Sequence, residues 1–169
     1  MDELTTLSNV GGSVEFVGGK VLTFTVANET YAIGIQDVKE IIEYGGVTRV
    51  PMVNAQVNGV LNLRGRIVPV IDLAERLQLP GEAAGKRSCV VVLDVKHGDE
   101  VVELGLMVNA VNQVITVEAN DLQQAPSFGA RIRDDFILSM ARVDGEFVII
   151  LDHPAVLSID EMAEAVPCI

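Results

Sequence analysis

The sequence has no tryptophan, and tyrosine and phenylalanine together make up only 4% of its 169 residues. It also has only two histidines and two cysteines. Aromatic rings form the stacking platforms of single-strand nucleic-acid sites, while histidine and cysteine supply many metal ligands and catalytic groups. The shortage of these residues favours a scaffold or binding module over an enzyme, and we expect neither a metal nor a cofactor.

Positive charge is also scarce, because 12 Lys and Arg face 24 Asp and Glu, for a net charge of −12. This balance argues against nucleic acid and against anionic membrane surfaces. The longest apolar runs, Cys89 to Leu93 and Phe147 to Leu151, are only strand-sized, which excludes a membrane-spanning helix. The acidic start MDELTTLSNVGG does not resemble a signal peptide. We therefore expect a cytoplasmic protein without membrane insertion, in which Cys89 and Cys168 are reduced thiols.

Short runs of Val, Ile, Thr, Tyr and Phe alternate with turn signals, which is typical of an all-β protein. We predict strands at 21–26, 30–35, 41–48, 57–63 and 67–71, and a second set at 88–95, 101–108, 113–117, 136–143 and 147–151. A connector, Pro80 to Lys86, separates the two sets. Turns such as Arg64-Gly65 and Asp144-Gly145 lie at hairpin spacing, so most strand pairs should be antiparallel.

An internal repeat relates the two sets. Ile33, Ile35, Val38 and Ile41 match Leu106, Val108, Val111 and Val114 at an offset of 73 residues. Leu61 and Leu63 match Leu138 and Met140 at 77, and IVPVID (67–72) matches FVIILD (147–152) at 80. Duplicated units of five short strands predict two small closed barrels, each burying its own core.

Helix should be minor and confined to short turns. Asp37, Asp72 and Ser158 have the spacing of helix N-caps, so each is expected to open a helical turn. Asp72 and Asp152 end equivalent units and could form a carboxylate dyad of a hydrolase. We favour the cap interpretation, because Glu75 fits a capping box and neither Asp precedes Thr-Gly or Ser-Gly.

The segment GVLNLRGRIVPVIDL (59–73) places two Arg in a tight turn of an acidic chain. An Arg held there offers a fork for a partner's carboxylate, or is simply a solvated turn charge. Val38 and Val111 hold equivalent positions and are either core residues or the walls of an apolar groove between the barrels. Such a groove leaves a small-ligand-binding β-barrel sensor as the alternative function.

Five segments together resemble the CheW family of chemotaxis coupling proteins: LTFTVANETYAIGIQDVKEI (22–41), VTRVP (47–51), GVLNLRGRIVPVIDL (59–73), LGLMVNAVNQV (104–114) and QQAP (123–126). The resemblance implies two intertwined five-stranded SH3-like β-barrels with short helical turns, a short C-terminal helix and no catalytic activity. It also implies an adaptor that links chemoreceptor cytoplasmic tips to the histidine kinase CheA by binding the kinase's regulatory domain. Other CheW-like domains are further candidate partners.

The resemblance divides the chain into a flexible tail (1–18), a CheW-like domain (19–159) and a C-terminal tail or helix (160–169). The barrels are expected at about 19–80 and 86–159. The N-terminal strand either stays in the first barrel or is exchanged into the second. Carried over residue by residue, the receptor-binding positions are Ile35, Val38, Glu40, Arg64 and Val111. The kinase-binding positions are Tyr44, Val47 and Arg49, and the structural motif positions are Gly59, Gly65 and Asp72. Asn109 departs from the family pattern, since many relatives have Asp there.

Overall fold

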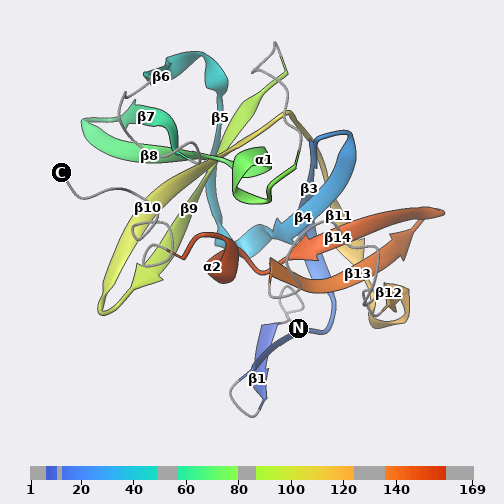
Figure 1. Ribbon diagram of the computed structural model, residues 1–169. Helices are drawn as coiled ribbons and strands as arrows, with labels where there is room; N and C mark the ends of the chain where they lie inside the picture. The colour runs from blue at the N-terminus through green and yellow to red at the C-terminus, as the bar shows by residue number, and fades with distance from the viewer. Residues whose placement is uncertain (1–6, 11–12, 49–56, 80–86, 124–135, 159–169) are drawn as a thin grey trace.

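The computed structural model describes residues 7–10, 13–48, 57–79, 87–123 and 136–158 (Figure 1). Strands dominate these residues, which confirms the predicted all-β class. The first half contains β3 (Gly19–Val26), β4 (Glu29–Gly34), β5 (Val38–Glu43), β6 (Val47–Thr48), β7 (Val57–Leu63) and β8 (Arg66–Asp72). The second half contains β9 (Cys89–His97), β10 (Glu100–Val108), β11 (Ala110–Val117), β12 (Leu122–Gln123), β13 (Ile137–Val143) and β14 (Glu146–Leu151).

Three short 3₁₀ turns and two one-turn α-helices occur in the described residues. These are η1 (Ile35–Asp37), η2 (Tyr44–Gly46), η3 (Ala119–Asp121), α1 (Leu73–Arg76) and α2 (His153–Val156). Asp37 ends η1 instead of opening a helical turn, because β5 begins at the next residue. The turn predicted after Ser158 lies outside the described residues, and no helix within them is long and apolar enough to span a membrane.

Each of the two large sheets is closed by one bent strand. The first sheet has the order β5-β9-β10-β8-β7-β6, and the second has the order β11-β3-β4-β14-β13-β12. β5 and β6 are neighbours in the chain across η2 and yet form opposite edges of their sheet, so the sheet must curl back on itself. β11 and β12 do the same across η3. With each bent pair counted as one strand, the result is two five-stranded barrels, as predicted.

The two barrels exchange hairpins, which changes the boundaries expected at 19–80 and 86–159. The β3–β4 hairpin lies between β11 and β14 in the second sheet, and the β9–β10 hairpin lies between β5 and β8 in the first. Parallel pairs, β8 with β10 and β4 with β14, join each hairpin to strands remote in sequence. We call the barrel of β5–β10 the first barrel and that of β3, β4 and β11–β14 the second. Strand exchange therefore involves a whole hairpin in each direction.

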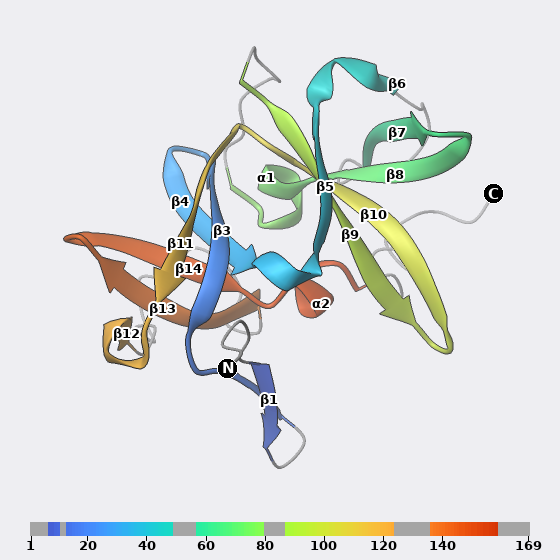
Figure 2. The same ribbon diagram turned by 180° about the vertical axis from the view of Figure 1, so that it is seen from behind.

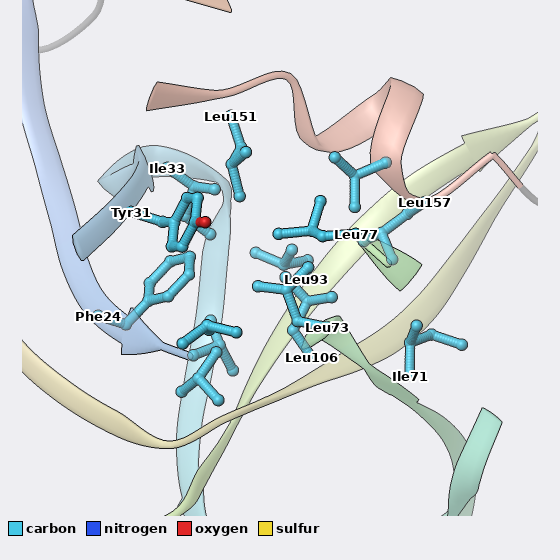
Figure 3. Packing of buried hydrophobic residues seen from close by; sticks show 14 of the residues in the cluster. Phe24, Tyr31, Ile33, Ile71, Leu73, Leu77, Leu93, Leu106, Leu151 and Leu157 are labelled. Atoms are coloured by element: carbon cyan, nitrogen blue, oxygen red, sulfur yellow. The ribbon is translucent and has the colours of Figure 1, made fainter. Parts of the chain in front are cut away.

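Each barrel buries a core of its own, as predicted, but the largest hydrophobic core lies between the barrels (Figure 3) and is shared by both. Val91, Leu93 and Val95 of β9 face this shared core. The alternate residues Val90 and Val92 face the smaller core inside the first barrel. Because such strands are buried on both faces, they read as continuous apolar runs without polar alternation. Figures 1 and 2 show α1 and α2 between the two barrels.

The duplication is visible in matching irregularities. β-Bulges occur between Val38 and Glu40 in β5 and between Val111 and Gln113 in β11, at the predicted offset of 73. In the hairpins that follow, Leu61 pairs with Val68 and Ala141 pairs with Val148, an offset of 80. The sequence match of Leu61 to Leu138 at 77 is therefore wrong, because the two-residue turns fix the hairpin register.

Residues 1–18, expected as a flexible tail, include a two-stranded antiparallel hairpin of β1 (Leu7–Val10) and β2 (Ser13–Phe16). The flexibility of this segment stays a prediction. The C-terminal segment 160–169 lies outside the described residues.

Candidate functional site

The bulge in β5 determines which way the predicted receptor-binding residues point. Val38 lies opposite Leu93, which faces the shared core, whereas Glu40 lies opposite Val92, which faces the first barrel's interior. The extra residue between them is Lys39. A bulge of this kind breaks the alternation of side chains along a strand. Val38 therefore packs against the shared core, while Glu40 lies on the other face of β5.

Arg64 and Glu40 form a two-pronged ion pair. The Arg64 Nη1 and Nη2 atoms donate to the Glu40 Oε1 and Oε2 atoms at 3.2 and 3.0 Å. The β7–β8 turn presents the guanidinium, because Arg64 and Gly65 have φ values of 53° and 86° and the Gly65 N–H donates to Asn62 Oδ1. Two positive φ values define the tight hairpin turn for which glycine is suited. The fork that could have received a partner's carboxylate is thus already paired with the chain's own Glu40.

A second charge network adjoins this pair. Glu103 of β10 accepts from Lys39 Nζ at 2.6 Å and from Arg66 Nη1 at 2.5 Å, and Lys39 Nζ also lies 3.6 Å from Asp94 Oδ1. The hydrogen bond with Glu103 raises the pKa of Lys39, and the same bond lowers the pKa of Glu103. Each group therefore holds the other in its charged form.

The two networks together define what we call the charged rim: Lys39, Glu40, Arg64, Arg66, Asp94 and Glu103. Three cations balance three carboxylates, so this surface carries no net charge in a strongly acidic chain. The sequence singled out the two Arg but gave no signal for Lys39, Asp94 or Glu103. Those three come together only through the pairing of β5, β9 and β10.

The second barrel has neutral residues at the positions equivalent to Lys39 and Glu40. There, the Gln113 N–H donates to Thr23 Oγ1 at 3.2 Å, and Asn112 Nδ2 donates to Thr25 Oγ1 at 3.2 Å. The duplicated units therefore differ in charge at the bulge. This asymmetry gives the first barrel a distinctive surface.

The predicted apolar receptor-binding residues lie at the margin of the shared core. Ile35, Val38 and Val111 are half-buried and pack against it. Val38 and Val111 also occupy equivalent bulge positions on β5 and β11. Part of each side chain therefore belongs to the core and part reaches the surface, and a role of Val38 and Val111 as walls of a binding groove stays a prediction.

The predicted kinase-binding residues are only partly described. Tyr44 and Val47 are half-buried and pack against the first barrel's core, so some of their surface is used by the fold. The Tyr44 N–H also donates to the Ser88 carbonyl at 3.2 Å. Arg49 lies outside the described residues.

The structural motif residues have clear local contacts. Gly59 is buried beside the β7 bulge, and Gly65 completes the turn described above. Asp72 Oδ1 accepts from the Glu75 N–H and Asp152 Oδ1 accepts from the Ala155 N–H, both at 3.3 Å. The cap interpretation of both aspartates is therefore confirmed. Asn109 Oδ1, at the position that departs from the family, accepts from the Ala27 N–H at 3.0 Å.

Chemically, the described residues offer surfaces for binding. They contain no group of three or more His, Cys, Asp or Glu able to hold a metal ion, and Cys89 is a free thiol. Paired barrels with a shared core, a charged rim and half-buried aliphatic residues define a β-barrel protein of the binding-module class.

Comparisons with known proteins identify the kind of module. The family model of the CheW-like domain matches residues 20–161. The chemotaxis protein CheW of Klebsiella aerogenes is 35% identical, covering 96% of this chain and 95% of the relative. That of Bacillus subtilis is 33% identical, covering 89% and 94%. The crystal structure of the scaffolding protein TtCheW from Thermoanaerobacter tengcongensis matches with a TM-score of 0.72 at 29% identity, covering 81% of this chain and 86% of that one.

The chain belongs to the CheW family, and its barrels are of the SH3-like type. Its role is that of an adaptor in chemotaxis. Nothing in the comparisons supports the alternative of a small-ligand sensor.

Proposed function

We propose that this adaptor works without catalysis or cofactor in the cytoplasm and couples the cytoplasmic tips of chemoreceptors to the histidine kinase CheA. One surface binds the receptor, and another binds the regulatory domain of the kinase. Binding of both partners biases the kinase toward one of its states, as in any coupling through linked binding equilibria.

One observation supports the proposed receptor-binding surface. Glu40 and Arg64 are 24 residues apart in sequence, and the family resemblance assigns each of them separately to receptor binding. Their direct ion pair, at 3.0 Å, means that both belong to one continuous surface. Lys39 and Arg66 extend it, whereas the half-buried Val38 lies on the other face of β5, at the margin of the shared core. Arginine is among the residues enriched in binding hot spots, so Arg64 is the first residue to test.

The pair is strong enough to orient Arg64 and weak enough to be rearranged by a partner. Arg64 keeps 70% of its side chain exposed and Glu40 keeps 29%, so solvent screens their attraction. Exposed ion pairs contribute about 0.5–1 kcal/mol when the geometry is two-pronged. An incoming receptor helix therefore meets a guanidinium already held in place and can add contacts to it.

The test measures affinity for a soluble receptor-tip fragment. We expect Arg64→Ala to weaken binding about tenfold, which is about 1.4 kcal/mol, because an interface arginine is lost. Arg142→Ala is the matched control, since Arg142 is exposed on β13 of the second barrel and should bind receptor normally. Unchanged affinity in Arg64→Ala would remove Arg64 from the receptor surface.

A charge exchange separates contact from local structure. The double variant Glu40→Arg with Arg64→Glu keeps an ion pair and should keep the stability of the wild type. If Arg64 contacts the receptor directly, this variant still binds weakly. Full recovery of affinity would instead mean that the pair only shapes the β5 and β7–β8 segments.

The kinase surface is tested separately. We propose Tyr44, Val47 and Arg49 for this role on the family resemblance. Arg49→Glu should lower affinity for the CheA regulatory domain and leave receptor affinity unchanged. Tyr44→Phe keeps the ring that packs against the core and removes the hydroxyl, so any loss of kinase binding cannot come from a cavity. Equal loss of both affinities in Arg49→Glu would contradict two separate surfaces.

A further inference from the structure

The one-turn helix α2 is held by three different parts of the molecule. At its start, His153 Nδ1 lies 3.6 Å from Asp37 Oδ2 of η1. At its end, Arg76 of α1 donates from Nε to the Val156 carbonyl at 2.5 Å. The Asp152 N–H donates to the Phe136 carbonyl, just before β13, at 2.8 Å. α2 therefore ties η1 to α1 of the first half and to the start of β13.

η1 is the point where the chain crosses between barrels. It follows β4 of the second barrel and leads directly into β5 of the first. Ile35 lies in this turn, and Val38 is the first residue after it. Whatever fixes Asp37 therefore also fixes the crossing segment that carries two proposed receptor contacts.

The contact between Asp37 and His153 is poorly solvated. The His153 side chain is only 10% exposed and that of Asp37 only 24%. Asp37 Oδ2 is buried and has no hydrogen-bond partner. A buried carboxylate oxygen without a donor is costly, so its placement beside an imidazole is the feature that needs a functional reason.

Burial controls the charge of both groups. It lowers the pKa of His153 below its ordinary value, and the nearby Asp37 and Asp152 carboxylates oppose this effect only in part. Burial likewise raises the pKa of Asp37, opposed by His153. The positive charge facing α2 is Arg76, which is held at the carbonyl end of the helix. At neutral pH the imidazole is therefore neutral, and its protonation favours an arrangement in which it is better hydrated.

We propose that Asp37 and His153 form a positioning pair that holds the η1 crossing against α2 and loosens when the surroundings become acidic. Acidification below the ordinary pKa of histidine shifts the molecule toward a state in which α2 no longer holds η1. Ile35 and Val38 then lose their fixed position relative to Val111. Because this inference rests on the proposed receptor surface, receptor affinity is expected to fall as the pH falls.

The experiment compares receptor affinity at pH 7.5 and pH 5.5. We expect the wild type to bind about fivefold more weakly at the lower pH, which is at the small end of coupling effects between sites. His153→Gln should remove most of this difference, because it deletes the titrating group. Asp37→Asn should enlarge it, because it deletes the carboxylate that partly offsets the effect of burial on the pKa of His153. The chain has only two histidines, so His97→Gln is the matched control and should keep the wild-type pH dependence.

A readout without receptor separates this proposal from the proposed function. Methyl NMR signals of Val38 and Val111 should shift with the same midpoint as the His153 imidazole in wild type, and should not do so in His153→Gln. Amide spectra of each variant report whether it is folded. The positioning role would be overturned if the methyl signals did not change with the His153 titration. It would also be overturned if receptor affinity in the folded His153→Gln variant kept the wild-type pH dependence. Loss of receptor binding at every pH together with linked methyl shifts would overturn only the proposed function.

Discussion

Gly105 of β10 lies where the first barrel leaves no room for a side chain. It pairs with Val92 on one side and Val70 on the other, so neighbours enclose it within the sheet. A Cβ atom added there would lie 2.5 Å from Val90 Cγ1 and 3.6 Å from Val70 Cγ2. Carbon atoms pack best at about 3.5–4.0 Å, and Val90 is fully buried. Gly105→Ala must therefore displace a well-packed side chain.

The size of the effect follows from packing. Overfilling a dense core costs about 1–3 kcal/mol. Val90→Ala removes two buried methyl groups and should cost about 2 kcal/mol. In the double variant the new methyl group occupies space vacated by the Val90 Cγ1 atom, so the combined loss should be smaller than the sum by at least about 1 kcal/mol.

Urea denaturation followed by circular dichroism measures these differences. A loss of 2 kcal/mol lowers the midpoint by roughly 1 M if the slope is about 2 kcal/mol per M. Gly45→Ala is the matched control, because a Cβ there meets nothing within 4 Å and should change stability by less than about 0.5 kcal/mol. If Gly105→Ala is as mild as Gly45→Ala, or if the Gly105 and Val90 effects add, the packing argument is wrong.

Three further predictions concern the shared core, α2 and the charged rim. Leu93→Ala should cost about 3 kcal/mol and leave a single cooperative transition for both barrels, whereas separate transitions in calorimetry would contradict a shared core. Arg76→Met should cost about 2 kcal/mol in urea unfolding, because two carbonyls of α2 lose a buried charged donor; an unchanged midpoint would refute that role. The pKa of Glu103 is lowered in the folded state, so the unfolded chain takes up this proton first, and the stabilisation is lost as pH falls below about 4. Glu103→Gln should lower stability at neutral pH and flatten this acid dependence; an unaltered slope would argue against the network.

Features determined by neighbouring residues could be predicted from the sequence. The turn at Arg64-Gly65 and the caps at Asp72 and Asp152 depend on residues at most three positions apart, and the structure contains all three. The bent strand at 38–48 was predicted as a single strand from Ile41 onward, because the break at η2 leaves its apolar pattern intact.

Features that depend on residues remote in sequence could not be predicted from the sequence. Nothing in β9 indicates that Val91 faces a core shared with the other barrel while Val90 faces its own, since both residues are simply apolar. The bulge at Lys39 puts Val38 and Glu40 on opposite faces of β5, although residues two positions apart in a regular strand share a face, and the sequence carries no mark of it. Asp37 looked like a helix cap, but its buried neighbour His153 lies 116 residues further along the chain.

The exchanged hairpins also constrain how the protein is made. During synthesis the β3–β4 hairpin emerges long before β11 and β14, the strands that flank it in the sheet. Until those strands are made, both edges of this apolar hairpin are unpaired. The first barrel can close once β10 has left the ribosome, but the second needs the chain as far as β14. Pairings this far apart in sequence form slowly and leave the nascent chain open to misassociation. The interlock that unites two duplicated units in the finished molecule therefore makes chaperone protection most valuable while residues 19–34 await their partners.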